Sequence, residues 1–129
     1  RRIAGDDDAT AEYVGILATD PADVFLQKNR YSALIPGSSH LERVLRGLSV
    51  DTVLIAGTKT NVCCESTARD AMMMDFKVVM VEDACAALSD EEHRATLETI
   101  IQQFGDVMRV DEVLSRLGTA PAARGMAAG

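Results

Sequence analysis

The chain has 129 residues, the length of one domain, and 47% of them are hydrophobic, which is enough to form a core. The formal net charge of -7 argues against nucleic acid or an anionic membrane surface as a partner. No apolar run approaches the roughly 20 residues that a membrane-spanning helix needs. The three cysteines, two of them adjacent, do not form the pattern of a secreted disulfide framework, so we expect a cytoplasmic protein in a reducing compartment.

The first part of the sequence contains few clear elements. It opens with Arg1 and shows no apolar core of a signal peptide, and we interpret the acidic run at residues 6–8 as a solvated loop, with a metal site as the alternative. The mainly apolar residues 23–28 are predicted to form a short strand. Lys28 ends that strand, at the edge where ligands bind in open α/β sheets; a surface lysine is the alternative. Tyr31 either walls a pocket or packs at the domain edge.

Strands and helices alternate through the rest of the chain. Two Ser-x-x-Glu capping boxes, beginning at Ser39 and Ser89, mark helix starts, and the two histidines near them are expected to be exposed and show no zinc-site spacing. The elements predicted by apolar periodicity are helix 39–48, strand 52–56, helix 61–75, strand 77–82, helix 90–104, strand 107–110 and helix 111–117. This alternation implies a parallel, Rossmann-like sheet covered by helices on both faces, a three-layer α/β/α fold. Residues 1–117 are predicted to form one domain, and the Gly/Ala/Pro-rich residues 118–129 a disordered tail.

Cys63 and Cys64 lie at the start of the second predicted helix. The free N–H groups and partial positive charge of a helix N-terminus help a thiol to lose its proton and can hold the oxygen of a tetrahedral intermediate. Cys64 shares an apolar stripe with Ala68 and Ala71, so we assign it to packing and assign Cys63 to a pocket. Spacing alone leaves open that both are buried small hydrophobic residues, and burial is also the favoured interpretation of Cys85.

The segment GTKTNVCCESTARDA resembles the nucleophile segment of the isochorismatase-like cysteine hydrolases, because Gly57, Thr60 and Cys63 meet the family spacing G-x-x-T-x-x-C. The upstream segment DVFLQKNRYSALIPGSSHLERVL resembles the family's lysine segment, with Lys28 followed by a Tyr-Ser pair. The later VVMVEDACAALSDEEHRATL resembles the strand and helix that come next in the family. The resemblance covers roughly residues 23–117 and is closest in character to amidohydrolases of ureido and carbamoyl compounds.

This resemblance implies roles for individual residues. Cys63 would be the nucleophile, and the charge of Lys28 would hold the reacting groups in their working protonation states. The backbone N–H groups of Lys59 and Cys63 would form the oxyanion hole, in a loop where the family tends to place a cis peptide, here Thr58–Lys59. No cofactor or metal is implied. The residues expected to line the substrate pocket are Tyr31 and Asn61.

The family pattern also contains elements that this sequence does not match. Members carry a catalytic aspartate on a first strand, followed by a second strand, and no segment before residue 23 resembles either of them. In the family's sheet those two strands lie between the lysine strand and the cysteine strand, so the strand predicted at 23–28 would have no lateral neighbour. Unpaired buried backbone groups cost about 1–3 kcal/mol each. We therefore expect the sequence to be a fragment, a processed product or an exchange partner in a larger assembly.

Several functions are consistent with these features. The first is a cysteine hydrolase that cleaves a C–N bond of a small amide, carbamoyl or ureido compound through a thioester, acting as a homo-oligomer. The second is a non-catalytic module that binds a partner or forms an oligomer. Vinyl-ether hydrolysis, the founding activity of the family, is a third. A thiol redox protein ranks last, because adjacent cysteines form a disulfide only with strain.

Overall fold

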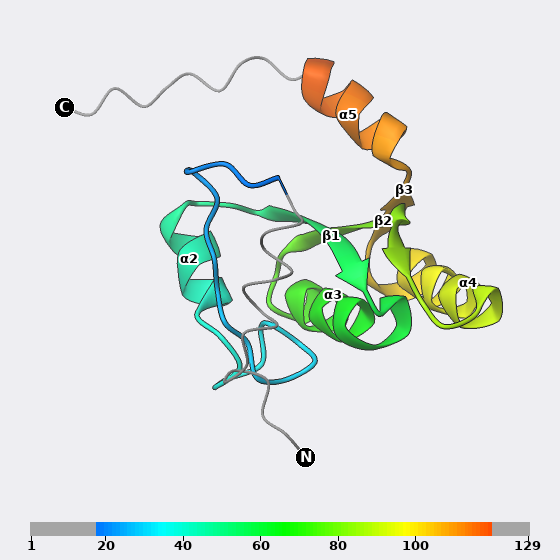
Figure 1. The fold of residues 1–129 in the computed structure, drawn as a ribbon, viewed down its shortest axis with the longest axis horizontal. Helices are drawn as coiled ribbons and strands as arrows, with labels where there is room; N and C mark the ends of the chain where they lie inside the picture. Colours follow the sequence, from blue (N-terminus) through cyan, green and yellow to red (C-terminus); the bar gives the residue numbers. More distant parts are fainter. Residues whose placement is uncertain (1–17, 120–129) are drawn as a thin grey trace.

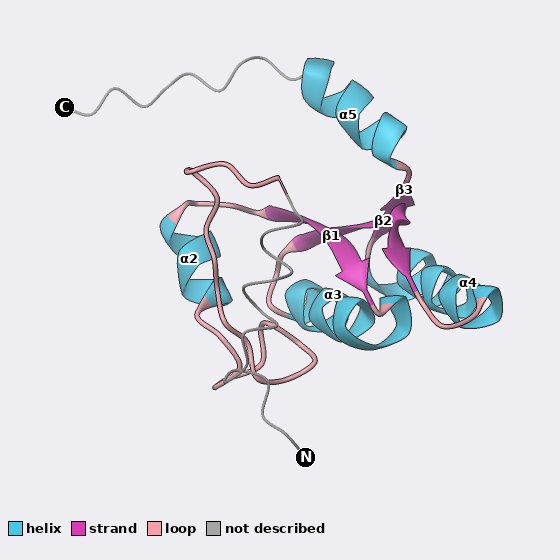
Figure 2. Ribbon diagram, in the orientation of Figure 1, coloured by secondary structure: helices cyan, strands magenta, loops and turns pink. Residues whose placement is uncertain are grey.

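The computed structural model describes residues 18–119, which contain a three-stranded parallel sheet (Figures 1 and 2). The strand order is β1 (Thr52–Thr58), β2 (Lys77–Ala86) and β3 (Asp106–Met108), with β2 in the centre. Each strand is short and rich in Val, Ile or Met, the composition expected of parallel strands covered on both faces. The predicted α/β class with a parallel sheet is therefore confirmed.

Helical segments follow each strand. Turn η1 (Thr60–Cys64) continues into α3 (Glu65–Met73), and α4 (Asp90–Thr99) continues into the turn η2 (Ile100–Phe104). These segments contact one another and lie together on one side of the sheet in Figure 1. The last helix, α5 (Val110–Thr119), contacts β2 and lies on the other side, while α2 (Leu41–Gly47) precedes β1. No helix within residues 18–119 is long and apolar enough to cross a membrane.

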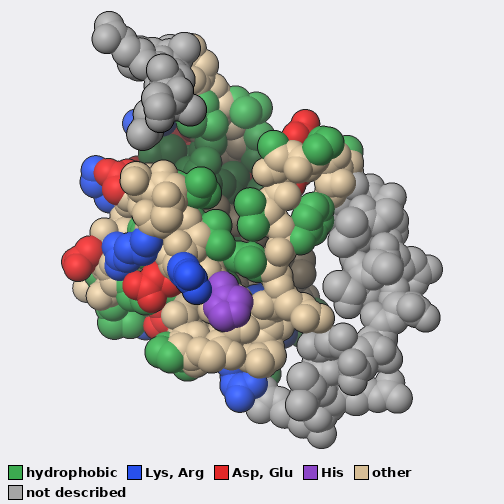
Figure 3. Space-filling view, turned by 90° about the vertical axis from the view of Figure 1, so that its left-hand side faces the viewer, with side chains coloured by type: hydrophobic (Ala, Val, Ile, Leu, Met, Phe, Trp, Pro, Cys, Tyr) green, Lys and Arg blue, Asp and Glu red, His purple; other side chains and the backbone are tan. Residues whose placement is uncertain are grey.

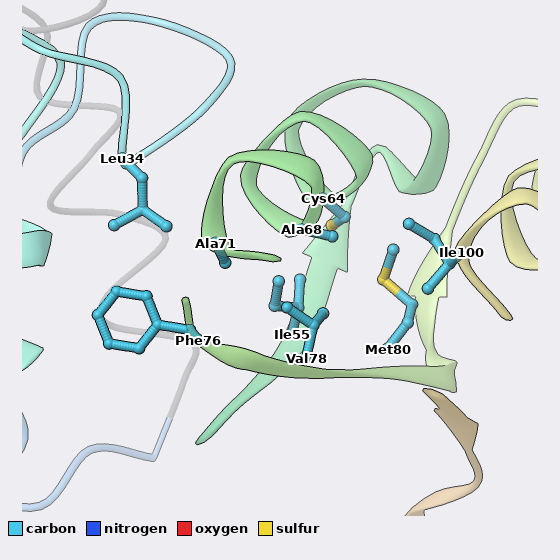
Figure 4. Close-up of a cluster of buried hydrophobic side chains, with 9 residues drawn as sticks. All are labelled: Leu34, Ile55, Cys64, Ala68, Ala71, Phe76, Val78, Met80 and Ile100. Carbon is cyan, nitrogen blue, oxygen red and sulfur yellow. The ribbon is translucent and has the colours of Figure 1, made fainter. Parts of the chain in front are cut away.

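The core lies between α3 and the sheet (Figure 4). On α3 the buried residues follow helical spacing, and Ala68 and Ala71 are fully buried because their small side chains allow the helix to approach the strands closely. Met80 of β2 and Ile100 of η2 are the largest fully buried apolar side chains of the described residues. The complete cluster consists of Leu34, Ile55, Cys64, Ala68, Ala71, Phe76, Val78, Met80 and Ile100.

The prediction of a strand at residues 23–28 is wrong. This segment belongs to no sheet, and Val24 and Phe25 are 60% and 61% exposed. A strand needs a neighbour that accepts and donates its backbone hydrogen bonds, and β1, the edge strand on that side, pairs only with β2 among the described residues. Asn29 instead donates its backbone N–H to the carbonyl of Ser38 (3.2 Å), which closes a loop.

Several predicted boundaries also change. β2 continues past residue 82 to Ala86, because the pairing with β1 resumes after a bulge, with Gly57 opposite Cys85. The acidic pair Glu82 and Asp83 therefore lies within the strand, where both carboxylates contact Arg109 (3.5 and 3.4 Å). At the other end, α5 extends through residue 119, so the predicted tail begins later than residue 118. The acidic run at residues 6–8 and the tail residues 120–129 lie outside the described residues.

One of the two predicted capping boxes has the expected N-cap bond. Ser89 is the N-cap of α4, and its Oγ accepts a hydrogen bond from the backbone N–H of Glu92 (3.2 Å). The N-cap of α2 is His40, which makes no side-chain cap, so the prediction for Ser39 is wrong. The Ser39 hydroxyl donates to the carbonyl of Ala33 (2.7 Å) and accepts from the N–H of Leu41, which ties the loop before α2 to its first turn.

The tight contact between Gly105 and β2 leads to a first prediction. A Cβ at position 105 would overlap the backbone carbonyl of Val78, so Gly105→Ala should lower the free energy of unfolding by about 1–3 kcal/mol. Gly47→Ala is the matched control, because nothing lies within 4 Å of its added Cβ; alanine in a helix is favoured by up to about 1 kcal/mol. Chemical denaturation monitored by circular dichroism measures both, and equal stability of the two variants would contradict the packing.

Candidate active site

A cavity of about 270 Å³ opens where β1 ends and η1 begins. In parallel α/β sheets this carboxyl edge is where ligands bind. The cavity is closed on one side by the loop around Lys28 and on the other by the first turn of the helical segment. Figure 3 shows hydrophobic side chains gathered around a hollow on the side of the molecule that carries α2. The cavity is lined by Lys28, Ala33, Leu54, Ile55, Ala56, Gly57, Thr58, Cys63, Cys64 and Thr67.

The two adjacent cysteines have different environments. Cys63 is half-buried and lines the cavity, whereas Cys64 is 5% exposed and belongs to the core cluster. A Cβ on Gly57 would lie 3.8 Å from the Cys64 sulfur, an ordinary van der Waals contact, so Cys64 packs next to the end of β1. Gly57 has a φ of 130°, which a glycine adopts without strain. The packing predicted for Cys64 from helical spacing is therefore confirmed, although its edge also borders the cavity.

The loop before Cys63 contains a cis peptide and is closed by two backbone hydrogen bonds. The peptide bond between Thr58 and Lys59 is cis, at the position where the resemblance places one. The Lys59 carbonyl accepts hydrogen bonds from the N–H groups of Val62 and Cys64, both 3.2 Å long, and this closes the turn η1. Lys59 and Cys63 thus lie at the loop-to-helix junction beside the cavity.

Residues 23–28, predicted as a strand, belong to a loop, and Lys28 of this loop lines the cavity. Its ammonium group donates to the backbone carbonyls of Arg30 (2.8 Å) and Tyr31 (3.2 Å), which holds the exposed side chain in place. The loop is joined to the nucleophile segment by Thr67, whose hydroxyl accepts from the N–H of Ala33 (3.1 Å) and donates to the carbonyl of Cys63 (2.8 Å). None of the described residues lining the cavity is a carboxylate, so Lys28 is the charged side chain among them.

Tyr31 and Asn61 do not line this cavity. Tyr31 is 55% exposed, and its backbone carbonyl accepts a hydrogen bond from the Lys28 ammonium group. Asn61 is half-buried within η1, and its Oδ1 atom is buried without a hydrogen-bond partner among the described residues. Their assignment as substrate contacts stays a prediction.

His93 is not the exposed residue that the sequence analysis predicted. It is half-buried, and its Nδ1 lies 2.8 Å from the hydroxyl of Thr60, a fully buried residue of η1. The signal was present in the sequence, because His93, Thr96 and Ile100 are spaced i, i+3 and i+7 and share one face of the helix. That face packs against η1 and α3, where Thr96 donates to the carboxylate of Glu65 (2.8 Å).

Cys85 of β2 is a further thiol near the cavity, half-buried rather than fully buried. Its S–H lies 3.7 Å from the carbonyl of Ile55 and from the sulfur of Met80. A hydrogen bond from the Cys64 thiol, with a smaller contribution from the backbone of Gly57, lowers the pKa of Cys85 from 9.0 to about 7. The same hydrogen bond, together with burial, raises the pKa of Cys64 well above its ordinary value. Cys64 is therefore a neutral thiol, consistent with its packing role.

The sequence matches the isochorismatase domain family over residues 2–112. The chain belongs to the isochorismatase family. It is 35% identical to Nicotinamidase 3 of Arabidopsis thaliana over 70% of this chain and 45% of that protein. It is 32% identical to the ureidoacrylate amidohydrolase RutB of Variovorax paradoxus, over 86% of this chain and 44% of that protein.

Solved structures of the isochorismatase family show the same fold. A cysteine hydrolase from Pseudomonas syringae superposes with a TM-score of 0.77 at 37% identity, covering 81% of this chain and 54% of that one. This chain spans about half the length of the curated relatives it matches. The described residues include the carboxyl edge of β1 and the turn η1 that follows it, where Cys63 lies.

The lowered pKa of Cys85 leads to a second prediction. Because the thiolate is half-formed at about pH 7, the rate of alkylation of Cys85 by iodoacetamide should level off by roughly pH 8. In Cys64→Ala the hydrogen bond that stabilises the Cys85 thiolate is lost. The pH at which Cys85 alkylation is half-maximal should therefore rise towards the value of a free thiol, whereas Cys63→Ala should leave it unchanged. Mass spectrometry of digested protein gives the rate at each cysteine. A wild-type rate that still rises above pH 9 would contradict the assignment.

Proposed function

We propose that this chain carries the nucleophilic half of a cysteine hydrolase that cleaves a C–N bond of a small amide, carbamoyl or ureido compound. The observation that carries the proposal is the cavity at the carboxyl edge of β1, which brings Cys63 and Lys28 together from segments 35 residues apart (63 minus 28). A thiol, a cation and a loop-to-helix junction are three of the parts that acyl transfer to sulfur uses.

In the proposed reaction the sulfur of Cys63 attacks the carbonyl carbon of the substrate. The carbonyl oxygen becomes an oxyanion and is held by the backbone N–H groups of Lys59 and Cys63. When the tetrahedral intermediate collapses, the C–N bond breaks, the amine leaves with a proton and a thioester remains on Cys63. Water then attacks the thioester, releases the acid or carbamate product and returns the thiol.

Lys28 contributes charge rather than a proton in this scheme. An ammonium group that lines the cavity would stabilise negative charge that develops on the reacting groups. Its position is fixed by hydrogen bonds to two backbone carbonyls of its own loop, those of Arg30 and Tyr31. The proton for the leaving amine is not assigned to any described residue, because the cavity lining contains no carboxylate; the resemblance places an aspartate for this step on a strand that would precede residue 23.

The relatives support the choice of bond. Nicotinamidase and ureidoacrylate amidohydrolase are names of enzymes that act on a C–N bond, and the structural neighbour from Pseudomonas syringae is named a cysteine hydrolase. Isochorismatase chemistry breaks a vinyl ether instead, but a nucleophilic thiol beside a fixed cation matches acyl transfer better. The non-catalytic module remains the second candidate, favoured by the carboxylate-free cavity and the unpaired edge of β1 among the described residues.

The third prediction separates these candidates. An activated aryl ester has a leaving group that needs no protonation, so the chain should form a stable acyl thioester on Cys63 even where no general acid is present. Mass spectrometry of digested protein should show an acyl group on Cys63 in the wild type, none at position 63 in Cys63→Ala, and an unchanged adduct on Cys63 in Cys64→Ala. Lys28→Met should slow acylation several-fold, since the favourable charge is lost.

Each outcome has a definite meaning. Amine release from carbamoyl and ureido compounds, lost in Cys63→Ala, would establish the hydrolase. Acylation that survives Cys63→Ala but is lost in Cys64→Ala would reverse the assignment of the two cysteines. If neither the aryl ester nor the amides react with Cys63, the hypothesis of a non-catalytic module is correct.

A further inference from the structure

One part-buried hydrogen bond joins η1, the turn that carries Cys63 and is called the nucleophile turn below, to α4, a helix with no residue in the cavity lining. The hydroxyl of Thr60 and Nδ1 of His93 lie 2.8 Å apart, although the residues are 33 positions apart in the sequence. Thr60 is fully buried, directly follows Lys59, and is the first residue of η1, whose fourth residue is Cys63. A hydroxyl removed from water requires a partner, and His93 provides it.

A second contact from α4 reaches the same segment on the other side of Cys63. Thr96 donates its hydroxyl to Oε2 of Glu65 (2.8 Å), and Thr96 is itself buried. The two contacts differ in one respect. Glu65 is also held by Arg69 of its own helix, with Oε1 2.7 Å from the guanidinium, so its position does not depend on Thr96 alone. The contact at Thr60 acts directly on the first residue of η1, which follows the cis peptide and the Lys59 carbonyl in the chain.

We propose that His93 is a positioning residue for the nucleophile turn: through Thr60 it fixes the backbone that presents the Cys63 sulfur and the N–H groups of Lys59 and Cys63 to the cavity. The inference rests on the proposed function and adds a residue outside the cavity to it. Lys59 connects the two parts physically, because its carbonyl accepts from Val62 and Cys64 on either side of Cys63. Thr60 directly follows this carbonyl in the chain, so a change in the Thr60 backbone conformation would change how the turn containing Cys63 is closed.

The test measures how fast iodoacetamide alkylates Cys63 in the complete chain at pH 7.0, a reaction that needs no substrate turnover. Cleavage after Lys59 and Arg69 isolates a peptide in which fragmentation separates Cys63 from Cys64. His93→Ala should slow alkylation of Cys63 by roughly tenfold, since small displacements of a reacting group have large effects on rate. His93→Asn, whose amide occupies the place of Nδ1, should restore the rate to within about twofold of the wild type.

The matched control is Thr96→Val, which removes the other contact of the same length from the same face of α4. It should lower the melting temperature about as much as His93→Ala while leaving the alkylation rate of Cys63 unchanged. Thr60→Val should slow alkylation as His93→Ala does, and the double variant should be no slower than either single one, because both remove one interaction. Should His93→Ala fail to fold, His93→Gln, with its amide one methylene further out, is expected to show the same slowing.

The positioning role is overturned if His93→Ala alkylates as fast as the wild type, if Thr96→Val slows the reaction equally, or if a folded His93→Asn does not recover. These outcomes are distinct from failure of the proposed function. That failure would appear in the wild type, as the absence of an acyl adduct on Cys63, whereas the positioning role is judged only from the ratios of alkylation rates among variants.

Discussion

The close packing of α3 on β1 and β2 is the constraint on which the site depends (Figure 4). Ala68 and Ala71 are fully buried, and their small side chains bring the helix near the strands. Cys64 continues the same stripe one turn earlier, over Gly57. Because neighbouring residues of a helix point about 100° apart, burial of Cys64 turns Cys63 away from the core and towards the cavity. Packing thereby leaves Cys63 the more exposed of the two adjacent thiols.

Short polar contacts hold the remaining parts of the site against this packed unit. Thr67 joins the loop that carries Lys28 to the carbonyl of Cys63, and His93 joins α4 to the turn before it. These bonds are made by hydroxyl groups that are half-buried or buried, where leaving a partner unmatched is costly. Hydrogen bonds therefore hold the Lys28 loop beside the cavity and tie α4 to the turn that carries Cys63, so their loss would affect stability as well as geometry.

The thiols of the site show how environment separates identical groups. Cys64 and Cys85 share a hydrogen bond, which raises the pKa of Cys64 and lowers that of Cys85. The buried sulfur thus remains neutral and the half-buried one carries charge more readily, in keeping with the cost of burying an unpaired charge. Cys63 differs from both, because it faces the cavity that Lys28 borders. The three cysteines have separate roles: packing, stabilised charge and, in the proposed function, the nucleophile.

The sequence by itself determined the elements whose signal is local. Apolar runs located β1 and β2, Ser89 located the start of α4, and helical spacing distinguished Cys64 from Cys63. Each of these features depends on periodicity or on a hydrogen bond between residues close in sequence. The information needed to predict it therefore lies within a single segment.

Only the tertiary structure decided the features that need a distant partner. Residues 23–28 have strand composition but no neighbouring strand among the described residues, and Glu82 and Asp83 lie within β2 because its pairing with β1 resumes beyond them. His93 was predicted to be exposed, yet its partner Thr60 comes from a turn 33 residues earlier. Backbone pairing, ion pairing and side-chain hydrogen bonding of this kind join segments whose separation in sequence carries no signal, so the fold has to bring them together before they can be recognised.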